Sequence, residues 1–362
     1  MKFPIIVLSI LFGVYSVFGE EHKNRVVLPA TVYAVPGVPV SIVFRNAVLL
    51  APGESMGFRD VASPVGSVSR DGSSWSFVPD DSQVGDHTIT IAGKDVVVKV
   101  VPRNAGGGRD ISLLIVGDSL TNATHYPNEI AALLNAPANP GWKLLGTHAP
   151  TRAKPGVRHE GYGGWTWSRF LTRWEPKAEQ SGKSKSSPFL FPANGSDPVL
   201  DFERYFHTYC EGQKPDFVTV LLGINDCFHA NPDDPSAIEN KIDTMLDSAD
   251  RFIAAMRTAS PETEIGICLT PAANDRDEAF YANYKNRYTR WGWRRIQFRL
   301  VERQMEHFGN RESENVYIIP TSVGIDPLTG YPPDNGGHPN EKGYQTLGRE
   351  IYCWLKWRLA ER

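Results

Sequence analysis

The chain has 362 residues, of which 41% are hydrophobic and 22% are charged, a composition that excludes a disordered or collagen-like protein. Its 38 Lys and Arg residues are balanced by 41 Asp and Glu residues, which gives a net charge of −3 and no basic surplus to neutralise nucleic-acid phosphates. We therefore expect no nucleic-acid partner, and the length suggests about two domains.

The first residues have the pattern of a secretory signal peptide. One lysine, Lys2, precedes an apolar run that ends near Gly19, before Glu20. The run is short for a transmembrane helix, and no later stretch reaches the ~18 apolar residues that a span needs. We therefore expect residues 1–19 to be removed and the remaining chain to be secreted or periplasmic, without a membrane span. An uncleaved anchor is the alternative.

Four cysteines follow this segment: Cys210, Cys227, Cys268 and Cys353. In an oxidising compartment they could form two disulfides, and the sequence leaves the pairing open. Neither a Cys-x-x-Cys motif nor a Cys/His cluster with zinc spacing is present. The sequence therefore predicts no structural metal.

Residues 25–102 carry short β-rich runs separated by Pro, Gly, Asp and Ser clusters, with no helical period between them. This pattern is typical of a small, immunoglobulin-like β-sandwich. Residues 103–108 end in consecutive glycines and predict a flexible linker. We expect a fragment that starts near Arg109 to fold without the sandwich.

From Arg109 onward, apolar runs with the length of buried parallel strands alternate with helical patterns. The strand-like runs are residues 111–116, 143–145, 217–222, 265–269 and 316–319. Ser236 and Glu239 match a capping box, and Asn340 is a candidate cap of the last helix. The alternation predicts an α/β domain over residues 109–362, with a doubly wound parallel sheet whose carboxyl edge forms the ligand crevice.

Four polar segments follow predicted strands or precede the last helix. Gly117-Asp118-Ser119-Leu120 directly follows the first strand, and Gly223-Ile224-Asn225-Asp226 follows the third. Residues 159–166 lie between them, and residues 334–340 precede the final helix. In order and spacing these segments resemble the SGNH, or GDSL-type, serine hydrolases. The resemblance implies a flavodoxin-like SGNH hydrolase domain that hydrolyses carboxylic esters without a cofactor.

A serine hydroxyl attacks an ester when a base removes its proton, and we expect His338 to be that base for the nucleophile Ser119. The tetrahedral intermediate also needs hydrogen-bond donors for its oxyanion. The resemblance implies that these donors are the backbone N–H groups of Ser119 and Gly164 and the side-chain amide of Asn225. Glycine at 164 fits this role, because a Cβ would hinder the approach of the ester.

The histidine segment departs from the family pattern. The family places an aspartate three residues before the catalytic histidine, where this chain has Asn335, and Asp334 lies one residue earlier. Asp334 is our candidate for the residue that orients His338, because an extra glycine in the loop could bring its carboxylate to the imidazole. The alternative is a Ser–His dyad in which Asn335, a backbone carbonyl or water holds the ring.

Two other reactive side chains need comparison with this set. Gly53-Glu54-Ser55-Met56-Gly57 matches the G-x-S-x-G nucleophile elbow, but no helical pattern follows it and the surrounding runs are sandwich-like. We interpret it as a loop. Cys227 lies close to Asn225, and we interpret it as a buried thiol or half of a disulfide rather than a nucleophile.

Aromatic residues near the motifs indicate a substrate. Tyr162, Trp165 and Trp167 flank Gly164. The two tryptophans together with His159 are our candidate substrate-binding residues, with core positions as the alternative. A second aromatic group precedes a predicted helix over residues 294–308: Tyr288, Trp291 and Trp293. Aromatic faces suit sugar rings, so we expect the ester to belong to an acetylated glycan.

The sequence thus predicts an exported serine esterase in which a β-sandwich precedes an SGNH-type hydrolase domain. A carbohydrate O-acetylesterase is the favoured interpretation. A lipolytic esterase or an arylesterase would share the catalytic residues and differ in the acyl pocket. A non-catalytic glycan-binding protein with a degenerate site is the remaining alternative, and the joint presence of Ser119, Asn225 and His338 argues against it.

Overall fold

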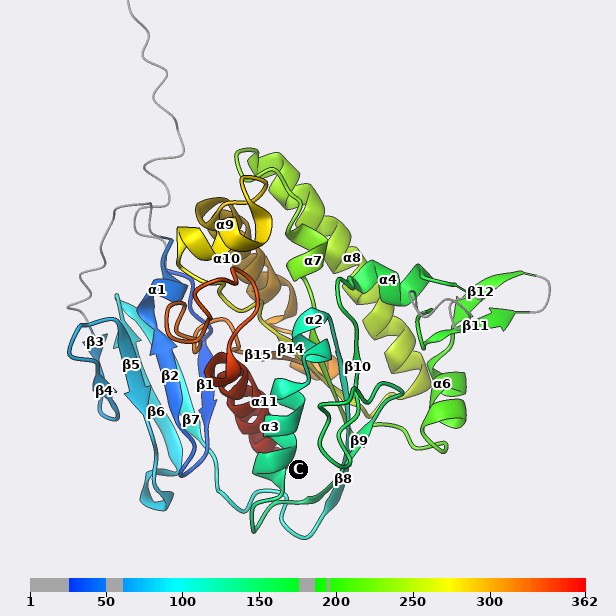
Figure 1. Cartoon of the computed structure of the whole chain (residues 1–362). Helices are drawn as coiled ribbons and strands as arrows, with labels where there is room; N and C mark the ends of the chain where they lie inside the picture. Colours follow the sequence, from blue (N-terminus) through cyan, green and yellow to red (C-terminus); the bar gives the residue numbers. More distant parts are fainter. Residues whose placement is uncertain (1–25, 50–60, 176–185, 194–195) are drawn as a thin grey trace, which may run out of the picture.

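The computed structural model describes residues 26–49, 61–175, 186–193 and 196–362, and Figure 1 shows a small β-rich unit beside a larger α/β domain. Residues 1–19, the predicted signal peptide, lie outside these ranges. The serine motif at residues 53–57 also lies outside them. Both interpretations therefore stay predictions.

Two small sheets face each other in the N-terminal unit, with strand orders β1-β7-β6-β3 and β2-β5-β4. Ile42, Trp75 and Ile89 are fully buried in the cluster between them, as the predicted sandwich requires. The elements are β1 Thr31–Ala34, β2 Val40–Val43, α1 Phe44–Ala47, β3 Val61–Ala62, β4 Ser67–Val68, β5 Ser74–Phe77, a 3₁₀ turn Asp81–Gln83, β6 Gly85–Ile91 and β7 Lys94–Val100.

One parallel sheet organises the α/β domain and confirms the predicted doubly wound fold. Its strands are β8 Asp110–Gly117, β9 Gly141–Leu145, β10 Glu160–Gly161, β13 Phe217–Leu221, β14 Glu264–Cys268 and β15 Val316–Ile319. β9 and β10 pair with successive halves of one edge of β8, and β13, β14 and β15 follow on its other side. The strand order reverses between β8 and β13, the switch point at which such sheets bind ligands.

Helices cover both faces of this sheet. The elements around the sheet are α2 Ser119–Asn122, α3 His125–Leu134, α4 Trp167–Thr172, β11 Leu190–Ala193, β12 Ser196–Leu200, α6 Phe202–Tyr209, α7 Ile224–Cys227, α8 Pro235–Ala259, α9 Asp277–Tyr284, α10 Arg290–Phe308, a 3₁₀ turn Glu312–Glu314 and α11 Glu341–Glu361. Leu113 and Ile115 of β8 pack with α3 and α11, whereas Leu114 and Val116 pack with α4, α6, α8 and α10. Among the residues described, no helix is long and apolar enough to cross a membrane.

The helix caps agree with the sequence prediction at α11 and differ at α8. Asn340 caps α11 through its side chain. At α8 the cap is Asp234 rather than Ser236, because the Asp234 carboxylate accepts the Ser236 backbone N–H at 3.0 Å. Glu239, the other half of the predicted capping box, pairs with Arg299 of α10 instead. This ion pair joins two helices of the same layer.

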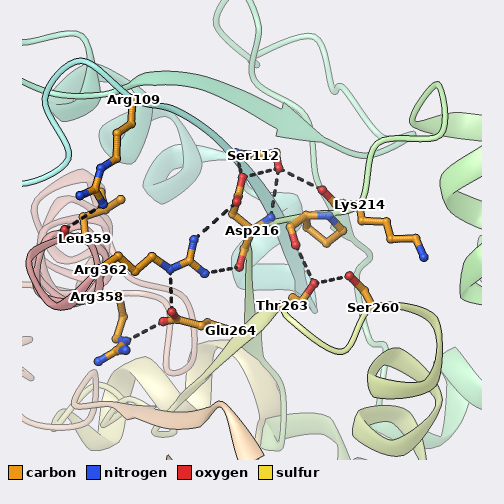
Figure 2. A network of polar contacts seen from close by, with 11 residues as sticks. Arg109, Ser112, Lys214, Asp216, Ser260, Thr263, Glu264, Arg358, Leu359 and Arg362 are labelled. Carbon is orange, nitrogen blue, oxygen red and sulfur yellow. Dashed lines mark hydrogen bonds and ion pairs between the residues drawn. The ribbon is translucent and has the colours of Figure 1, made fainter.

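A polar network ties the amino-terminal ends of the central strands to the end of α11 (Figure 2). The carboxylate of Asp216 accepts the backbone N–H and the hydroxyl of Ser112 at 2.8 and 2.9 Å, which joins the β8 strand to the start of β13. Arg358 and Arg362 both donate to the carboxylate of Glu264, at the start of β14. The network stabilises the edge of the sheet opposite to the carboxyl ends of the strands.

The four cysteines all lie within the described residues, where they are buried and free. The disulfides that the sequence allows are therefore not formed in this structure. Burial raises the pKa of the Cys210 thiol to about 11 and that of Cys227 further still. Cys227 is a buried thiol, and the pKa of its side chain makes it a poor nucleophile.

The segment 103–108 is a packed turn rather than the flexible linker that the sequence predicts. Lys356 of α11 is fully buried, and its ammonium group donates to the backbone oxygen of Ala105. Gly106 lies against Leu359, whose Cδ1 would be 2.9 Å from an added Cβ. The end of the sandwich is therefore fixed on α11.

The sandwich and the α/β domain also share apolar core. Tyr33 of β1 stacks on Trp357 of α11, with ring centroids 4.5 Å apart and an interplanar angle of 13°. Val35 and Val38 belong to the same buried cluster as Leu355 of α11. Removal of the sandwich would expose this surface to water, at a cost of roughly 25 cal/mol per Å² of apolar area.

We therefore expect the fragment 109–362 to be insoluble or to melt well below the full chain, the reverse of the expectation from the sequence. The measurements are the solubility of the fragment and of the full chain after expression, and the melting temperature of each. A fragment that melts within a few degrees of the full chain would show that the shared core contributes little to the stability of the α/β domain.

Candidate active site

Ser119 begins α2 directly after β8, at the switch point of the sheet. The turn requires glycine at 117, because an added Cβ would lie 1.9 Å from Thr121 Oγ1 and 2.9 Å from the backbone oxygen of Leu221 in β13. Asp118 caps α2, since its Oδ1 accepts a backbone N–H two residues further on at 2.9 Å. The Ser119 hydroxyl is thus presented at the carboxyl edge of the sheet.

His338, from the loop before α11, meets this hydroxyl. Its Nε2 lies 3.0 Å from Ser119 Oγ. Burial lowers the pKa of His338 below its ordinary value of 6.5, because the imidazolium form loses solvation. The ring is therefore neutral near pH 7 and able to accept the serine proton.

The structure does not bring Asp334 to His338. Asp334 is exposed, and no hydrogen bond or ion pair joins the two side chains within the described ranges. Asn335 Oδ1 instead accepts the backbone N–H groups of Gly337 and His338 at 3.1 and 2.9 Å. Asn335 therefore lies inside the turn, whereas Asp334 lies in solvent. The arrangement is a Ser–His dyad in which the position of the loop determines the position of the His338 ring.

We therefore expect Asp334→Asn to lower kcat by less than about tenfold, and Asn335→Ala to lower it by roughly 10- to 100-fold, because small displacements of a catalytic group are costly. The measurement is kcat on one soluble acetyl ester, with folding checked by thermal melting. A strong loss for Asp334→Asn together with a mild loss for Asn335→Ala would show that the carboxylate orients the ring after all.

The backbone N–H groups of Ser119 and Gly164, two of the predicted oxyanion donors, are free in the part of the chain that the structure describes. Gly164 has φ +75°, a left-handed conformation that glycine adopts without strain. Its carbonyl oxygen accepts from Arg169, while its N–H, like that of Ser119, has no hydrogen-bond partner among the residues described. Such unpaired donors are what an oxyanion requires.

The Asn225 amide, the third predicted donor, is held in place from two sides. Its Nδ2 donates to Asp118 Oδ2 and to the backbone oxygen of Trp165, each at 3.1 Å. Both amide hydrogens are therefore engaged in the free enzyme, and an oxyanion would share one of them in a three-centre bond. These contacts connect the loop after β13 with the loop that carries Gly164.

Buried carboxylates lie on either side of Asn225. Asp118 is 1% exposed, and burial raises its pKa to about 7, with the charge of Asp226 as a further cause. Burial also raises the pKa of Asp226 to about 7. Asp226 Oδ1 accepts the Trp167 backbone N–H at 3.2 Å, whereas its buried Oδ2 has no partner in the described structure.

Asp226→Asn should become more stabilising as the pH rises. The folded-state pKa of Asp226 lies above its ordinary value of 3.8, so the contribution of this group to stability is present at low pH and is lost between about pH 4 and about pH 7. Asparagine does not ionise and shows no such loss. The melting temperature of the variant relative to wild type should therefore rise by a few degrees between about pH 5 and about pH 8.

Asp247→Asn, on an exposed face of α8, is the matched control for this measurement. Its melting-temperature difference from wild type should not follow the same trend. If the melting temperatures of Asp226→Asn and wild type changed with pH in parallel, Asp226 would not be protonated on folding.

A cavity of about 220 Å³ opens beside Ser119 and His338. One side of it is polar, where the exposed His229 shares a hydrogen bond with the hydroxyl of Tyr288. The other walls are largely aromatic, and the aromatic residues are Phe228, Tyr284, Tyr288, Trp293 and Tyr331. The loops after β13 and β14 and the start of α10 supply most of them.

The sequence analysis named two of these five aromatic residues, Tyr288 and Trp293, and missed Phe228, Tyr284 and Tyr331. Phe228 follows Asn225 by three residues, and this closeness is the signal that could have found it. For Tyr284 the sequence offers no signal, because α9 reaches the cavity through tertiary packing.

The three predicted substrate-binding residues are core residues instead. Trp165 is 5% exposed and packs on Tyr162 and Phe170. Trp167 is 1% exposed, and His159 is fully buried, with Nε2 3.1 Å from the hydroxyl of a neighbouring threonine. Their side chains are buried in the core and offer no face to a ligand.

Within the described ranges, no group of three or more His, Cys, Asp or Glu side chains is placed to hold a metal ion. The site is a serine and a histidine at the switch point of a flavodoxin-like sheet, next to free N–H donors. The chain belongs to the GDSL-like lipase/acylhydrolase family, whose model matches residues 115–346. It is therefore an SGNH-type carboxylic ester hydrolase.

No curated protein is significantly similar to the chain. Among solved structures, an acetyl esterase variant with a bound acetate ion is 17% identical, covers 69% of this chain and 99% of its own, and has a TM-score of 0.42. A family 3 carbohydrate esterase from Talaromyces cellulolyticus is 18% identical, with 70% and 99% covered and a TM-score of 0.43. A family 3 carbohydrate esterase from Clostridium thermocellum is 17% identical, with 70% and 100% covered and a TM-score of 0.39. Similarity at this level carries no argument about the substrate of the present chain.

Proposed function

We propose that the protein is an exported serine esterase that removes acetyl groups from a glycan through an acyl-enzyme on Ser119. The observation that carries the proposal is the 3.0 Å distance between Ser119 Oγ and His338 Nε2 beside an aromatic cavity. The signal-like N-terminal sequence supports export.

In this mechanism neutral His338 accepts the proton of Ser119 Oγ as the oxygen bonds to the ester carbonyl carbon. The N–H groups of Ser119 and Gly164 and the amide of Asn225 stabilise the oxyanion. His338 then gives its proton to the leaving alcohol, and the C–O bond breaks. A water molecule then gives a proton to the same ring and bonds to the acyl carbon. The bond between that carbon and Ser119 Oγ breaks, His338 returns the proton to Oγ, and the carboxylic acid leaves.

The cavity supports a small substrate. Its volume of about 220 Å³ lies below the ~300–1,000 Å³ of pockets that enclose drug-sized ligands. Such a space suits a single sugar unit or a short acyl group and has little room for a long acyl chain. The rings of Phe228, Tyr284, Tyr288 and Trp293 supply apolar surfaces of the kind on which sugar rings stack.

Chain-length selectivity tests the proposal. The rates kcat/KM are measured for the p-nitrophenyl esters of acetate, butyrate and octanoate, and acetate release is measured on a panel of acetylated polysaccharides. We expect acetate to be preferred over octanoate by at least about 100-fold, since an acyl chain too long for the cavity displaces the ester carbonyl from Ser119 Oγ, and a displacement of about 1 Å costs a factor of this size.

Each outcome separates this proposal from its rivals. Preference for octanoate would indicate a lipolytic enzyme, and high activity on aryl esters without release of acetate from any polysaccharide would indicate an arylesterase. Polysaccharide binding without turnover of any ester would indicate a glycan-binding protein. Export is tested separately, by sequencing the N-terminus of the protein secreted from cells that express the full chain.

A further inference from the structure

Besides its contacts with α11, the N-terminal sandwich contacts the hydrolase domain through α1, where the backbone oxygen of Arg45 accepts from the guanidinium group of Arg294 in α10 (Figure 1). Arg45 on α1 forms an ion pair with one carboxylate oxygen of Asp275, and Arg290 of α10 pairs with the other. The Asp275 side chain is 11% exposed, whereas that of Arg45 is 43% exposed. A nearly buried carboxylate is thus held between one arginine from each domain.

Asn274, the residue before Asp275, is 1% exposed and contacts the catalytic loop. Its Nδ2 donates to the backbone oxygens of Pro332 and Asn335 at 2.8 and 2.9 Å. Its backbone N–H donates to the backbone oxygen of Gly336 at 3.0 Å. These hydrogen bonds hold the loop immediately before His338.

The imidazole of His338 has no carboxylate partner in the described structure, so its orientation depends on where this loop lies. We propose that Arg45 of the sandwich is a positioning residue for His338, acting through Asp275 and the hydrogen bonds of Asn274. The inference rests on the proposed esterase function. It gives the sandwich a part in catalysis beyond stabilising the fold.

The ion pair suits this role because of its burial. A surface ion pair contributes little to stability, but a mostly buried carboxylate that loses a partner shifts toward solvent or its remaining partner. Without Arg45, the Asp275 carboxylate would keep its ion pair with Arg290 and the charge of the nearby Arg294, and the segment that carries Asn274 would move toward them. A displacement of about 1 Å in a catalytic group lowers turnover by up to ~100-fold.

The test compares Arg45→Ala, Arg45→Lys and Arg103→Ala with wild type on a soluble acetyl ester. Arg103 is the matched control, because it forms an exposed ion pair with Asp81 within the N-terminal half, at 3.3 Å, and does not touch the catalytic loop. Active-site titration gives the concentration of reactive serine, so that kcat is expressed per active site. We expect Arg45→Ala to lose roughly tenfold in kcat with KM nearly unchanged. Arg45→Lys should recover part of the loss, and Arg103→Ala should match wild type.

A second comparison asks whether Arg45 acts through His338. Adding Arg45→Ala to His338→Ala should change the residual rate by less than about twofold, because residues that act as a unit are not additive. If Arg45→Ala does not fold, Arg45→Gln keeps the length of the side chain without its charge and enters the same comparisons.

Failure of this inference is distinct from failure of the proposed function. Wild-type turnover by His338→Ala would overturn the esterase mechanism itself. An inactive His338→Ala together with unchanged kcat in a folded Arg45→Ala, or an equal loss in Arg103→Ala, would overturn only the positioning role.

Discussion

Ser119→Ala should lose about 10³-fold or more in kcat and still fold, because the change removes the nucleophile and leaves the scaffold intact. The hydroxyl lies at the cavity and makes its hydrogen bond with His338 alone among the described side chains. Its removal takes this partner from His338 Nε2, but the half-buried ring lines the open cavity, where solvent can replace the hydroxyl, so the melting temperature should stay close to that of wild type.

His338→Ala should lose a similar factor, and the double variant should be scarcely slower than either single one. The measurement is kcat and KM on the acetyl ester, with an exposed serine four residues after Gly164, Ser168→Ala, as the matched control. Turnover by Ser119→Ala close to that of wild type would end the interpretation as a serine hydrolase.

The strand ends and the reactive residues could be predicted because their signals are local. The apolar run at 111–116 becomes β8 with one extra residue at each end, and the residues that follow it reach the crevice because parallel strands end at one edge. Ser119 and Asn225 each sit within a few residues of a strand. The sequence therefore places both near the switch point without knowledge of the packing.

The lining of the cavity could not be predicted in the same way, because burial of an aromatic ring is a property of the fold. Trp165 and Trp167 stand beside Gly164 in the chain, yet their rings turn into the core beneath it. Tyr284 and Trp293 are far from the motifs in sequence and reach the cavity through α9 and α10. The presence of an aromatic residue in the sequence does not show whether its ring lies in the core or lines the cavity.

The conformation of the loop before His338 also could not be predicted from the sequence. The choice between Asp334 and Asn335 depends on which side chain lies inside the turn, and Asn274 decides this from a different segment by binding the loop backbone. Likewise, the glycines at 106–108 suggested a free linker, and the turn became fixed because α11 packs on it. Tertiary contacts override a local preference in both cases.

Asn225→Ala should lower kcat by roughly 10²–10³ with a modest change in KM, as removal of an oxyanion donor does. The contact strengthens as negative charge develops on the substrate oxygen, so the loss appears in the chemical step. The change also leaves Asp118 Oδ2 without its donor in a buried site, and some loss of thermal stability should accompany the loss of rate. Asn240→Ala, on an exposed face of α8, is the matched control and should leave both quantities unchanged.

The changes in kcat and in KM together show which role Asn225 has. Its amide already donates both hydrogens, to Asp118 and to Trp165, so a role in holding the loops together is the competing explanation. A purely structural role would lower the titrated concentration of active sites and the melting temperature while leaving kcat per active site unchanged. A loss confined to KM would mean that the amide binds substrate and transition state equally. Only a fall in kcat per active site, measured on protein that melts as a single folded species, identifies Asn225 as an oxyanion donor.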